Sequence, residues 1–211
     1  MHLFLCYDID SIPIDQALAL VSPQRREQVL AFRPEASRKR CAGAYLLLRL
    51  ALHRVFGIDE APLLGYATGG KPFLQQYPHI HFNLSHCREA VACAVDTHPV
   101  GVDVEGLTHY SPSVAEYVCN GVELQSVLHA PDPAVAFIRL WTRKEATVKL
   151  SGKGIDNDIK TAISDQVSYL TTEVPSHHCV YTVASYSPIP PLQPVTVSFL
   201  DLLHQNLPGE R

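Results

Sequence analysis

The chain has 211 residues, a length that fits one large domain or two small ones. Hydrophobic residues make up 46% and charged residues 18%, which is typical of a globular protein with a buried core. A net charge of −4 provides no overall positive field for nucleic acid or an anionic membrane surface, and no apolar stretch approaches the roughly 20 residues of a spanning helix. We therefore expect neither nucleic acid nor a membrane as a partner.

The first quarter of the sequence predicts a strand followed by two helices. The opening residues, to about position 8, are apolar and lack a basic start, which is typical of a first strand and not of a signal peptide. Ser22, followed by proline, is a favoured start for a helix that runs to about Phe32. Pro34 can start a second helix in the same way, and its apolar residues recur at helical spacing until Gly57 ends it.

Strands dominate the middle of the chain. The stretch "TGGKPF" predicts a turn. Alternating polar and apolar residues then predict three strands, at residues 79–86, 90–96 and 100–105.

Helices are predicted after these strands, and strands return at the end. A helix is expected from Ser111, a second from Asn120, whose spacing to Glu123 has capping-box form, and a third over residues 134–150. The last strands are expected near residues 167–171, 179–186 and 195–202. A break near residues 96–99 suggests an α+β protein with two subdomains, residues 1–98 and residues 99–211.

Basic residues are concentrated in the first of these subdomains. Six of the 17 lysines and arginines lie within sixteen positions: Arg25, Arg26, Arg33, Arg38, Lys39 and Arg40. A compact basic patch on a mildly acidic protein favours a small polyanion as ligand over a nucleic-acid duplex. The alternative is a solvated basic face of the second helix, and the residues alone leave both interpretations open.

The six cysteines indicate a reducing environment. They form no C-x-x-C pair and no zinc-ribbon spacing, so we expect reduced thiols in a cytoplasmic protein.

Two acidic side chains mark the central strand "VGVDVE". Alternation places Asp103 and Glu105 on one face, where they repel each other unless a cation lies between them. Carboxylate oxygens are hard ligands that favour Mg²⁺, or Mn²⁺, over zinc. The alternative is the solvent-facing edge of an amphipathic strand.

A third carboxylate is available from the helix that carries "WTRKEATVK". Trp141, Glu145 and Lys149 share one stripe of this helix because they are spaced four residues apart. The stripe suggests charges that point into a cleft beside the core. Glu145 and Lys149 also have the orientation of a simple surface ion pair, and periodicity does not separate the two.

Further candidate phosphate ligands precede the central strand. Ser85 and His86 lack the surroundings of a nucleophile elbow, but both are good phosphate donors. Lys71 follows two glycines on a turn that is not a P-loop, and it could still bind an anion. His79, His81 and His86 are too loosely spaced for a convincing zinc site.

In order along the chain, "GKP", "FNLSHC", "VGVDVE", "WTRKEATVK" and "GKG" resemble the signature of the 4′-phosphopantetheinyl transferases, most closely the surfactin-synthetase-activator type. The resemblance spans Ser22 to Gly154. It implies two similar α/β subdomains related by a pseudo-two-fold axis. It also implies transfer of the phosphopantetheine arm of coenzyme A to a serine of an apo acyl or peptidyl carrier protein, with release of 3′,5′-ADP.

The resemblance assigns roles to individual residues. It implies that Asp103, Glu105 and Glu145 hold Mg²⁺, with Mn²⁺ as a substitute, and that Lys149 contacts the pyrophosphate. The residues implied to contact coenzyme A phosphates are Arg25, Arg40, Lys71, Ser85 and His86. We expect Glu145 to act as the base toward the carrier serine, while Lys149 and His86 stabilise the leaving group.

Three features depart from the family pattern. Cys41 stands where a threonine or a similar phosphate-contacting residue is expected, and Gln28 replaces a frequent lysine. The stretch "YVCNGVELQSV" follows the usual carrier-recognition region only loosely. We further expect a monomer.

Two other functions are compatible with the same residues. One is a Mg²⁺-dependent phosphohydrolase of small nucleotides, in which the three acids activate water. The other is a non-catalytic module that binds coenzyme A or a carrier protein. Lys149 and the phosphate ligands around the acids favour transfer.

Overall fold

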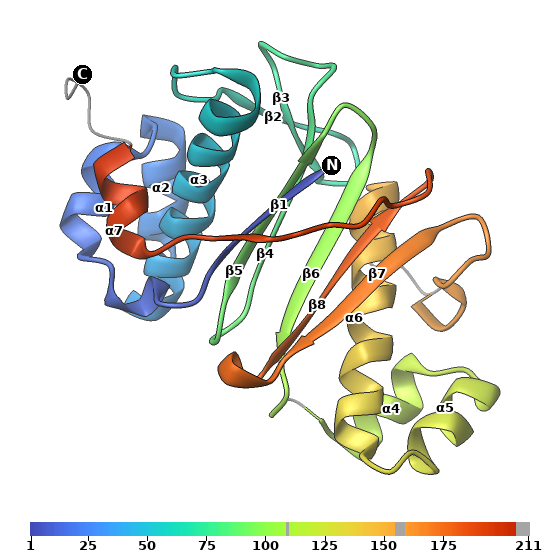
Figure 1. Ribbon diagram of the computed structural model, residues 1–211. Helices are drawn as coiled ribbons and strands as arrows, with labels where there is room; N and C mark the ends of the chain where they lie inside the picture. The colour runs from blue at the N-terminus through green and yellow to red at the C-terminus, as the bar shows by residue number, and fades with distance from the viewer. Residues whose placement is uncertain (109, 155–158, 206–211) are drawn as a thin grey trace.

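The computed structural model describes residues 1–108, 110–154 and 159–205. Two sheets stand side by side, each covered by a long helix on its outer face (Figure 1). The mixed α+β class predicted from the sequence is confirmed. The relation of the two halves by a pseudo-two-fold axis stays a prediction.

The first sheet has the strand order β4-β5-β1-β9. β1 (His2–Cys6) and β5 (Val91–Asp96) run antiparallel at its centre, with β4 (His81–His86) outside β5. α3 (Glu35–Phe56) packs on its outer face, and α1 (Ile14–Leu20) and α2 (Pro23–Ala31) pack against α3 (Figure 1). A separate hairpin is formed by β2 (Leu64–Tyr66) and β3 (Pro72–Leu74).

The second sheet has the order β6-β8-β7, all antiparallel. Its strands are β6 (Val100–Gly106), β7 (Ser168–Val174) and β8 (Cys179–Ser185). α6 (Pro133–Ser151) packs along the face of this sheet, and α4 (Pro112–Val118) and α5 (Gly121–Leu128) lie near the N-terminal end of α6 (Figure 1). Short 3-10 turns occur at Ile9–Ser11, Ile159–Thr161 and Pro175–His177.

The predicted helix starts are confirmed where a capping side chain supplies the signal. Ser22 accepts a hydrogen bond from the Arg25 backbone N–H at the start of α2. Asn120 and Glu123 form the predicted capping box of α5. α3 ends at Gly57 in the left-handed conformation, with φ of 68°, which glycine adopts without steric cost.

The alternation in β6 sends its two faces to different environments. Val100, Val102 and Val104 are fully buried in an apolar cluster between the two sheets, together with residues of β1 and β5. The opposite face faces α6. Gly101 has no room for a side chain there, since a Cβ would lie 2.1 Å from the Ala146 carbonyl oxygen. This glycine therefore lets α6 approach the strand that carries Asp103 and Glu105.

The end of the chain returns to the first sheet. β9 (Val195–Thr196) pairs in parallel with β1, and α7 (Phe199–Gln205) packs against α3 and α1. The division into residues 1–98 and 99–211 stays a prediction, and residues 195–205 pack with the first half.

The predicted strand at residues 195–202 is wrong beyond Thr196. Ser198 Oγ accepts the Asp201 N–H, while Asp201 Oδ2 accepts the Ser198 N–H. This reciprocal capping begins a helix in place of a longer strand.

All six cysteines are buried and unpaired, which confirms the prediction of free thiols. Within the described ranges, no helix combines the length and the apolar character that crossing a bilayer requires.

Candidate active site

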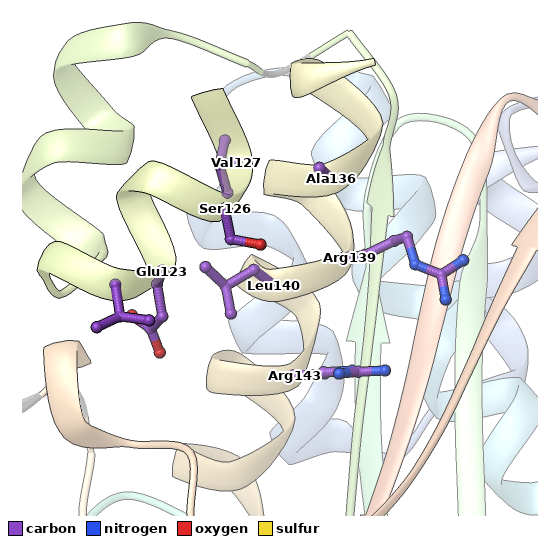
Figure 2. Close-up of a pocket in the computed structure, with 8 residues that line it drawn as sticks. Glu123, Ser126, Val127, Ala136, Arg139, Leu140 and Arg143 are labelled. Atoms are coloured by element: carbon purple, nitrogen blue, oxygen red, sulfur yellow. The ribbon is translucent and has the colours of Figure 1, made fainter. Parts of the chain in front are cut away.

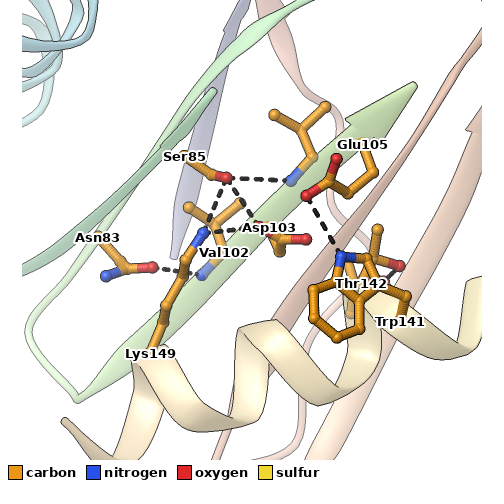
Figure 3. A network of polar contacts seen from close by, with 10 residues as sticks. Asn83, Ser85, Val102, Asp103, Glu105, Trp141, Thr142 and Lys149 are labelled. Carbon is orange, nitrogen blue, oxygen red and sulfur yellow. Dashed lines mark hydrogen bonds and ion pairs between the residues drawn. The ribbon is translucent and has the colours of Figure 1, made fainter. Parts of the chain in front are cut away.

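The site begins where the edges of the two sheets meet. β4 is the edge strand of the first sheet and β6 that of the second. Side chains of β4 reach across to the backbone of β6: Asn83 Oδ1 accepts the Val102 N–H at 2.8 Å, and Ser85 Oγ accepts the Val104 N–H at 3.3 Å (Figure 3). Ser85 is thereby held beside the acidic face of β6.

Three of the predicted residues are in direct contact. Lys149 Nζ lies 2.6 Å from Asp103 Oδ1 and 2.9 Å from Ser85 Oγ, and Ser85 Oγ donates to Asp103 Oδ1 at 2.8 Å (Figure 3). Lys149 thus forms its ion pair with Asp103, across the junction between α6 and β6. Asp103 is 1% exposed, which excludes the alternative of a solvent-facing strand edge.

The other two predicted acids, Glu105 and Glu145, lie near the contact of Lys149 with Asp103 and Ser85. Trp141 Nε1 donates to Glu105 Oε1 at 3.4 Å, so the tryptophan orients this carboxylate. Burial, and next the nearby Asp103 carboxylate, raise the pKa of Glu105 to about 7. The same two causes raise the pKa of the buried Glu145. The three acids are therefore close enough to oppose one another's ionisation.

The donor set suits a divalent cation. Asp103 Oδ2 and Glu145 Oε1 are buried oxygens without a hydrogen-bond partner, and buried polar atoms of this kind are uncommon. Hard carboxylate oxygens that repel one another are the ligands that Mg²⁺ accepts. In the described part of the chain, no three acidic, histidine or cysteine side chains are already grouped closely enough to hold an ion. The assignment of all three carboxylates to one metal stays a prediction.

A cavity of about 280 Å³ adjoins the cluster. Lys71, Lys149 and Glu145 line it, together with Asn83 and the glycine turn before Lys71. Lys71 Nζ donates to the carbonyl oxygens of Val100 (3.2 Å) and Leu150 (2.9 Å), so it bridges the two halves. Burial lowers its pKa to about 8.

His86 stands at the end of β4, where its ring reaches the surface. Desolvation by the surrounding protein, and next the Lys149 ammonium, lower the pKa of His86, with a smaller effect from Arg40. His86 is therefore within electrostatic reach of both cations, and it is neutral at pH 7.

The two predicted arginines each already have protein partners. Arg40 forms a two-point ion pair with Asp10, with Nε 3.2 Å from Oδ1 and Nη2 3.0 Å from Oδ2. Arg25 Nη1 lies 3.6 Å from Cys41 Sγ, and its guanidinium carbon is 5.3 Å from the centre of the Tyr45 ring. Among the described residues, no contact joins Arg25 to Ser85, Asp103 or Lys149.

Comparison with known proteins assigns the family. The sequence model of the 4′-phosphopantetheinyl transferase superfamily matches residues 99–184. The 4′-phosphopantetheinyl transferase psf-1 of Bacillus pumilus is 32% identical over 85% of this chain and 79% of its own length. The chain belongs to the 4′-phosphopantetheinyl transferase superfamily. The transferase HetI of a Nostoc species is 30% identical over 82% of this chain and 84% of its own, and Sfp of Bacillus subtilis is 26% identical over 82% and 79%.

Membership confirms the resemblance noted from the motifs, and it fixes the enzyme class as phosphopantetheinyl transfer. In this transferase, the "GKP" and "GKG" motifs meet at the cavity. A Cβ at Gly69 would lie 1.8 Å from the Gly152 carbonyl oxygen, so only glycine permits the contact. Two motifs that are about eighty residues apart therefore form one wall.

Sequence reasoning missed Asn83, Lys144 and Asp10, and for Trp141 it missed the bond to Glu105. Asn83 lies inside a recognised motif but was given no role at the site. Lys144 is fully buried and bonds to Glu123 Oε2 (2.9 Å) and to the Ile159 and Lys160 carbonyl oxygens. A lysine directly before Glu145 in a buried helix was the available signal. Nothing in the sequence links Asp10 to Arg40, thirty positions away.

A cavity of about 410 Å³, larger than the one beside the acidic cluster, lies elsewhere in the transferase. It is a groove between α5 and α6 with none of the predicted site residues in its lining (Figure 2). Arg139 in this groove pairs with Glu173 at 2.6 Å, and Arg143 bonds to Thr171 Oγ1 at 3.0 Å. Size alone therefore does not identify the site.

Proposed function

We propose that this enzyme transfers the 4′-phosphopantetheine group of coenzyme A to a serine of an apo acyl or peptidyl carrier protein, in a Mg²⁺-dependent reaction that releases 3′,5′-ADP. One observation carries the proposal: Lys149 of α6 bonds simultaneously to Asp103 of β6 and Ser85 of β4. The two halves thus bring an ammonium, a hydroxyl and buried carboxylates together beside a cavity.

Coenzyme A fits this arrangement because it carries a pyrophosphate and a 3′-phosphate. Lys71 and Lys149 line the cavity, and Ser85 can donate to a phosphate oxygen. His86, neutral at pH 7, has one ring N–H to donate. In the proposal, Arg40 and Arg25 hold the remaining phosphate charge, with Arg40 exchanging Asp10 for the ligand.

In the proposal, the metal is bound by the three predicted carboxylates. Asp103, Glu105 and Glu145 would hold Mg²⁺, and the support is the two unpartnered buried oxygens together with the mutual repulsion of the acids. When bound, the ion would act as a Lewis acid that offsets negative charge on the pyrophosphate. Mn²⁺ has the same ligand preference.

Residues of this chain are proposed to accept the proton of the carrier serine and to stabilise the leaving 3′,5′-ADP. The carrier serine oxygen bonds to the β-phosphorus, the phosphoanhydride bond breaks, and 3′,5′-ADP leaves with the bonding electrons. In the proposal the serine proton goes to Glu145, which lines the cavity. Lys149 and His86 donate to the departing phosphate oxygens. The predicted monomeric state and cytoplasmic location stay predictions.

The test is intact mass spectrometry of an apo carrier protein incubated with the enzyme, coenzyme A and Mg²⁺. We expect the carrier to gain the mass of one phosphopantetheine, and the gain should disappear when EDTA removes the metal. Coenzyme A breakdown without carrier modification would replace transfer with phosphohydrolysis. Binding of coenzyme A without any product would leave only a binding module.

A further inference from the structure

The junction between the two sheets depends on side chains. β4 and β6 are both edge strands, and in the described residues no backbone ladder joins them. The buried N–H groups of Val102 and Val104 are instead satisfied by Asn83 and Ser85. An unsatisfied buried N–H is costly, so these two side chains act in place of a neighbouring strand.

The two bonds also define a register. Each joins residues nineteen positions apart, 83 to 102 and 85 to 104, so β4 and β6 are matched at two consecutive points. The ladder of β6 with β8 and the packing of α6 already turn Asp103 and Glu105 toward α6. Side chains alternate along a strand, so a slip of β4 by one residue would turn Ser85 away from these acids. The register of this junction therefore decides whether Ser85 meets Asp103 and Lys149.

Of the two side chains, only Asn83 uses its oxygen for the β6 backbone alone. Ser85 Oγ shares its bond to Val104 with Asp103 and Lys149, and that bond is the longer, at 3.3 Å. Asn83 Oδ1 accepts only the Val102 N–H, at 2.8 Å. Because a backbone N–H can only donate, this bond also fixes which end of the amide is oxygen.

The amide nitrogen of Asn83 points away from β6. The residue is 4% exposed and lines the 280 Å³ cavity, and Figure 3 shows its nitrogen turned from the strand. Among the described residues no hydrogen bond is made by this nitrogen. A carboxylate at this position could keep the bond to Val102 but would bring a negative charge to the cavity wall.

We propose that Asn83 is a positioning residue: by capping Val102 it sets β4 against β6, so that Ser85 meets Asp103 and Lys149 beside the cavity. The inference rests on the proposed function for its kinetic consequence. It predicts that an acceptor at position 83 governs kcat, while the charge of that acceptor governs the KM for coenzyme A.

The experiment compares Asn83→Leu, which has similar volume and no acceptor, with Asn83→Asp, which keeps the acceptor. Gln76→Leu is the matched control, because Gln76 Oε1 also accepts a backbone N–H, from Leu63 at 2.8 Å, beside the separate hairpin. Hydrogen exchange of the peptide covering residues 100–106 reports the junction directly. Steady-state kinetics with coenzyme A and an apo carrier protein report its effect on the reaction.

We expect Asn83→Leu to exchange faster than the wild type at residues 100–106 and to lose about tenfold or more in kcat, a change that one buried hydrogen bond can cause. Asn83→Asp should restore both slow exchange and most of kcat, while its KM for coenzyme A rises. Gln76→Leu should match the wild type in both measurements.

Several outcomes would overturn the inference. Wild-type kcat in a folded Asn83→Leu variant would show that the bond does not position Ser85 for the reaction. Asn83→Asp with kcat or exchange no better than Asn83→Leu would do the same, as would unchanged exchange in both. If Asn83→Leu does not fold, Asn83→Asp decides alone: slow exchange and most of the wild-type kcat are expected of it, and fast exchange with a low kcat would overturn the inference. A wild-type enzyme that transfers nothing would refute the proposed function, and the exchange comparison would still test the junction.

Discussion

The acidic and basic sides of the site differ in how their charges are satisfied. The acidic side consists of Asp103, Glu105 and Glu145, and the basic side of Arg25, Arg40 and Lys71. On the acidic side, two buried oxygens lack partners and the pKa values of two acids are raised. On the basic side, each cation already contacts a carboxylate, a ring or a carbonyl oxygen. Arg25 Nε is also buried without a partner, so the basic side is not fully satisfied either. The proposed cation would complete the acidic side, whereas Arg40 would have to exchange Asp10 for a ligand.

The two sides should respond differently to mutation. If the buried acids hold the metal as proposed, removing one takes away a ligand that no neighbour can replace, so its effect should be large. A basic residue must give up its protein partner before it binds the ligand, so it contributes less net binding energy. Its removal should therefore have a smaller effect on activity. The Arg40–Asp10 pair is half exposed at Asp10, and exposed pairs are worth about 1 kcal/mol or less. A phosphate can displace such a partner at little cost.

The largest effect is expected from Glu145→Gln. The amide keeps the volume but cannot accept the serine proton, so transfer should fall by about 10²- to 10⁴-fold. Carrier modification followed by intact mass measures this, and circular dichroism checks the fold. Glu173→Gln, on the neighbouring β7, is the control that should retain activity. Full activity in Glu145→Gln would remove Glu145 as base and as ligand.

Asp103→Asn should have the next largest effect. The change removes one charged oxygen donor and the ion pair with Lys149, so the Mg²⁺ concentration for half-maximal activity should rise by about 10- to 100-fold. A Mg²⁺ titration measures this, and raised Mg²⁺ should restore part of the activity. An unchanged Mg²⁺ requirement would mean that Asp103 is not a ligand.

Arg40→Ala tests the basic side. Loss of a charged hydrogen-bond donor to phosphate should raise the KM for coenzyme A by about tenfold, and the KM for the carrier should change less. Steady-state titration of each substrate separates the two constants. The reverse pattern would place Arg40 on the carrier-protein surface.

The sequence predicts which residues share one face of a strand or helix better than it predicts which of these elements come into contact. Alternation placed Asp103 and Glu105 on one strand face, and helical spacing placed Glu145 and Lys149 on one stripe, because both periodicities depend only on neighbouring residues. The ion pair of Lys149 with Asp103 spans 46 positions, and no periodicity reports it. From the sequence, a surface pair of Lys149 with Glu145 was only one of two open interpretations.

The misses have the same physical origin. Asn83 belongs to a recognised motif, yet its role depends on which edge strand of the other sheet lies beside it. The strand predicted at residues 195–202 matched a β-branched pattern, but the reciprocal capping of Ser198 and Asp201 starts a helix there. Capping by Ser22 and Asn120 was predicted correctly because serine-proline and capping-box signals are local to those positions.

Asp10→Asn should lower the KM for coenzyme A, the constant that Arg40→Ala raises, and by a smaller factor. Without its charge, Asp10 competes less for the Arg40 guanidinium, so the KM for coenzyme A should fall by up to about fivefold, the range that an exposed ion pair allows. The double variant with Arg40→Ala is the control and should match Arg40→Ala alone. A higher KM in Asp10→Asn would show that Asp10 orients Arg40 for the ligand.

The smallest effect should appear in the pH dependence of coenzyme A binding. Burial lowers the pKa of Lys71 to about 8, below the ordinary value for lysine. The protonated form attracts phosphate, so raising the pH through 8 removes the charge and should raise the KM for coenzyme A about two- to threefold by pH 9. Lys71→Arg keeps its charge over this range and should flatten the profile. A wild-type KM that stays level from pH 7 to pH 9 would assign Lys71 to bridging Val100 and Leu150 alone.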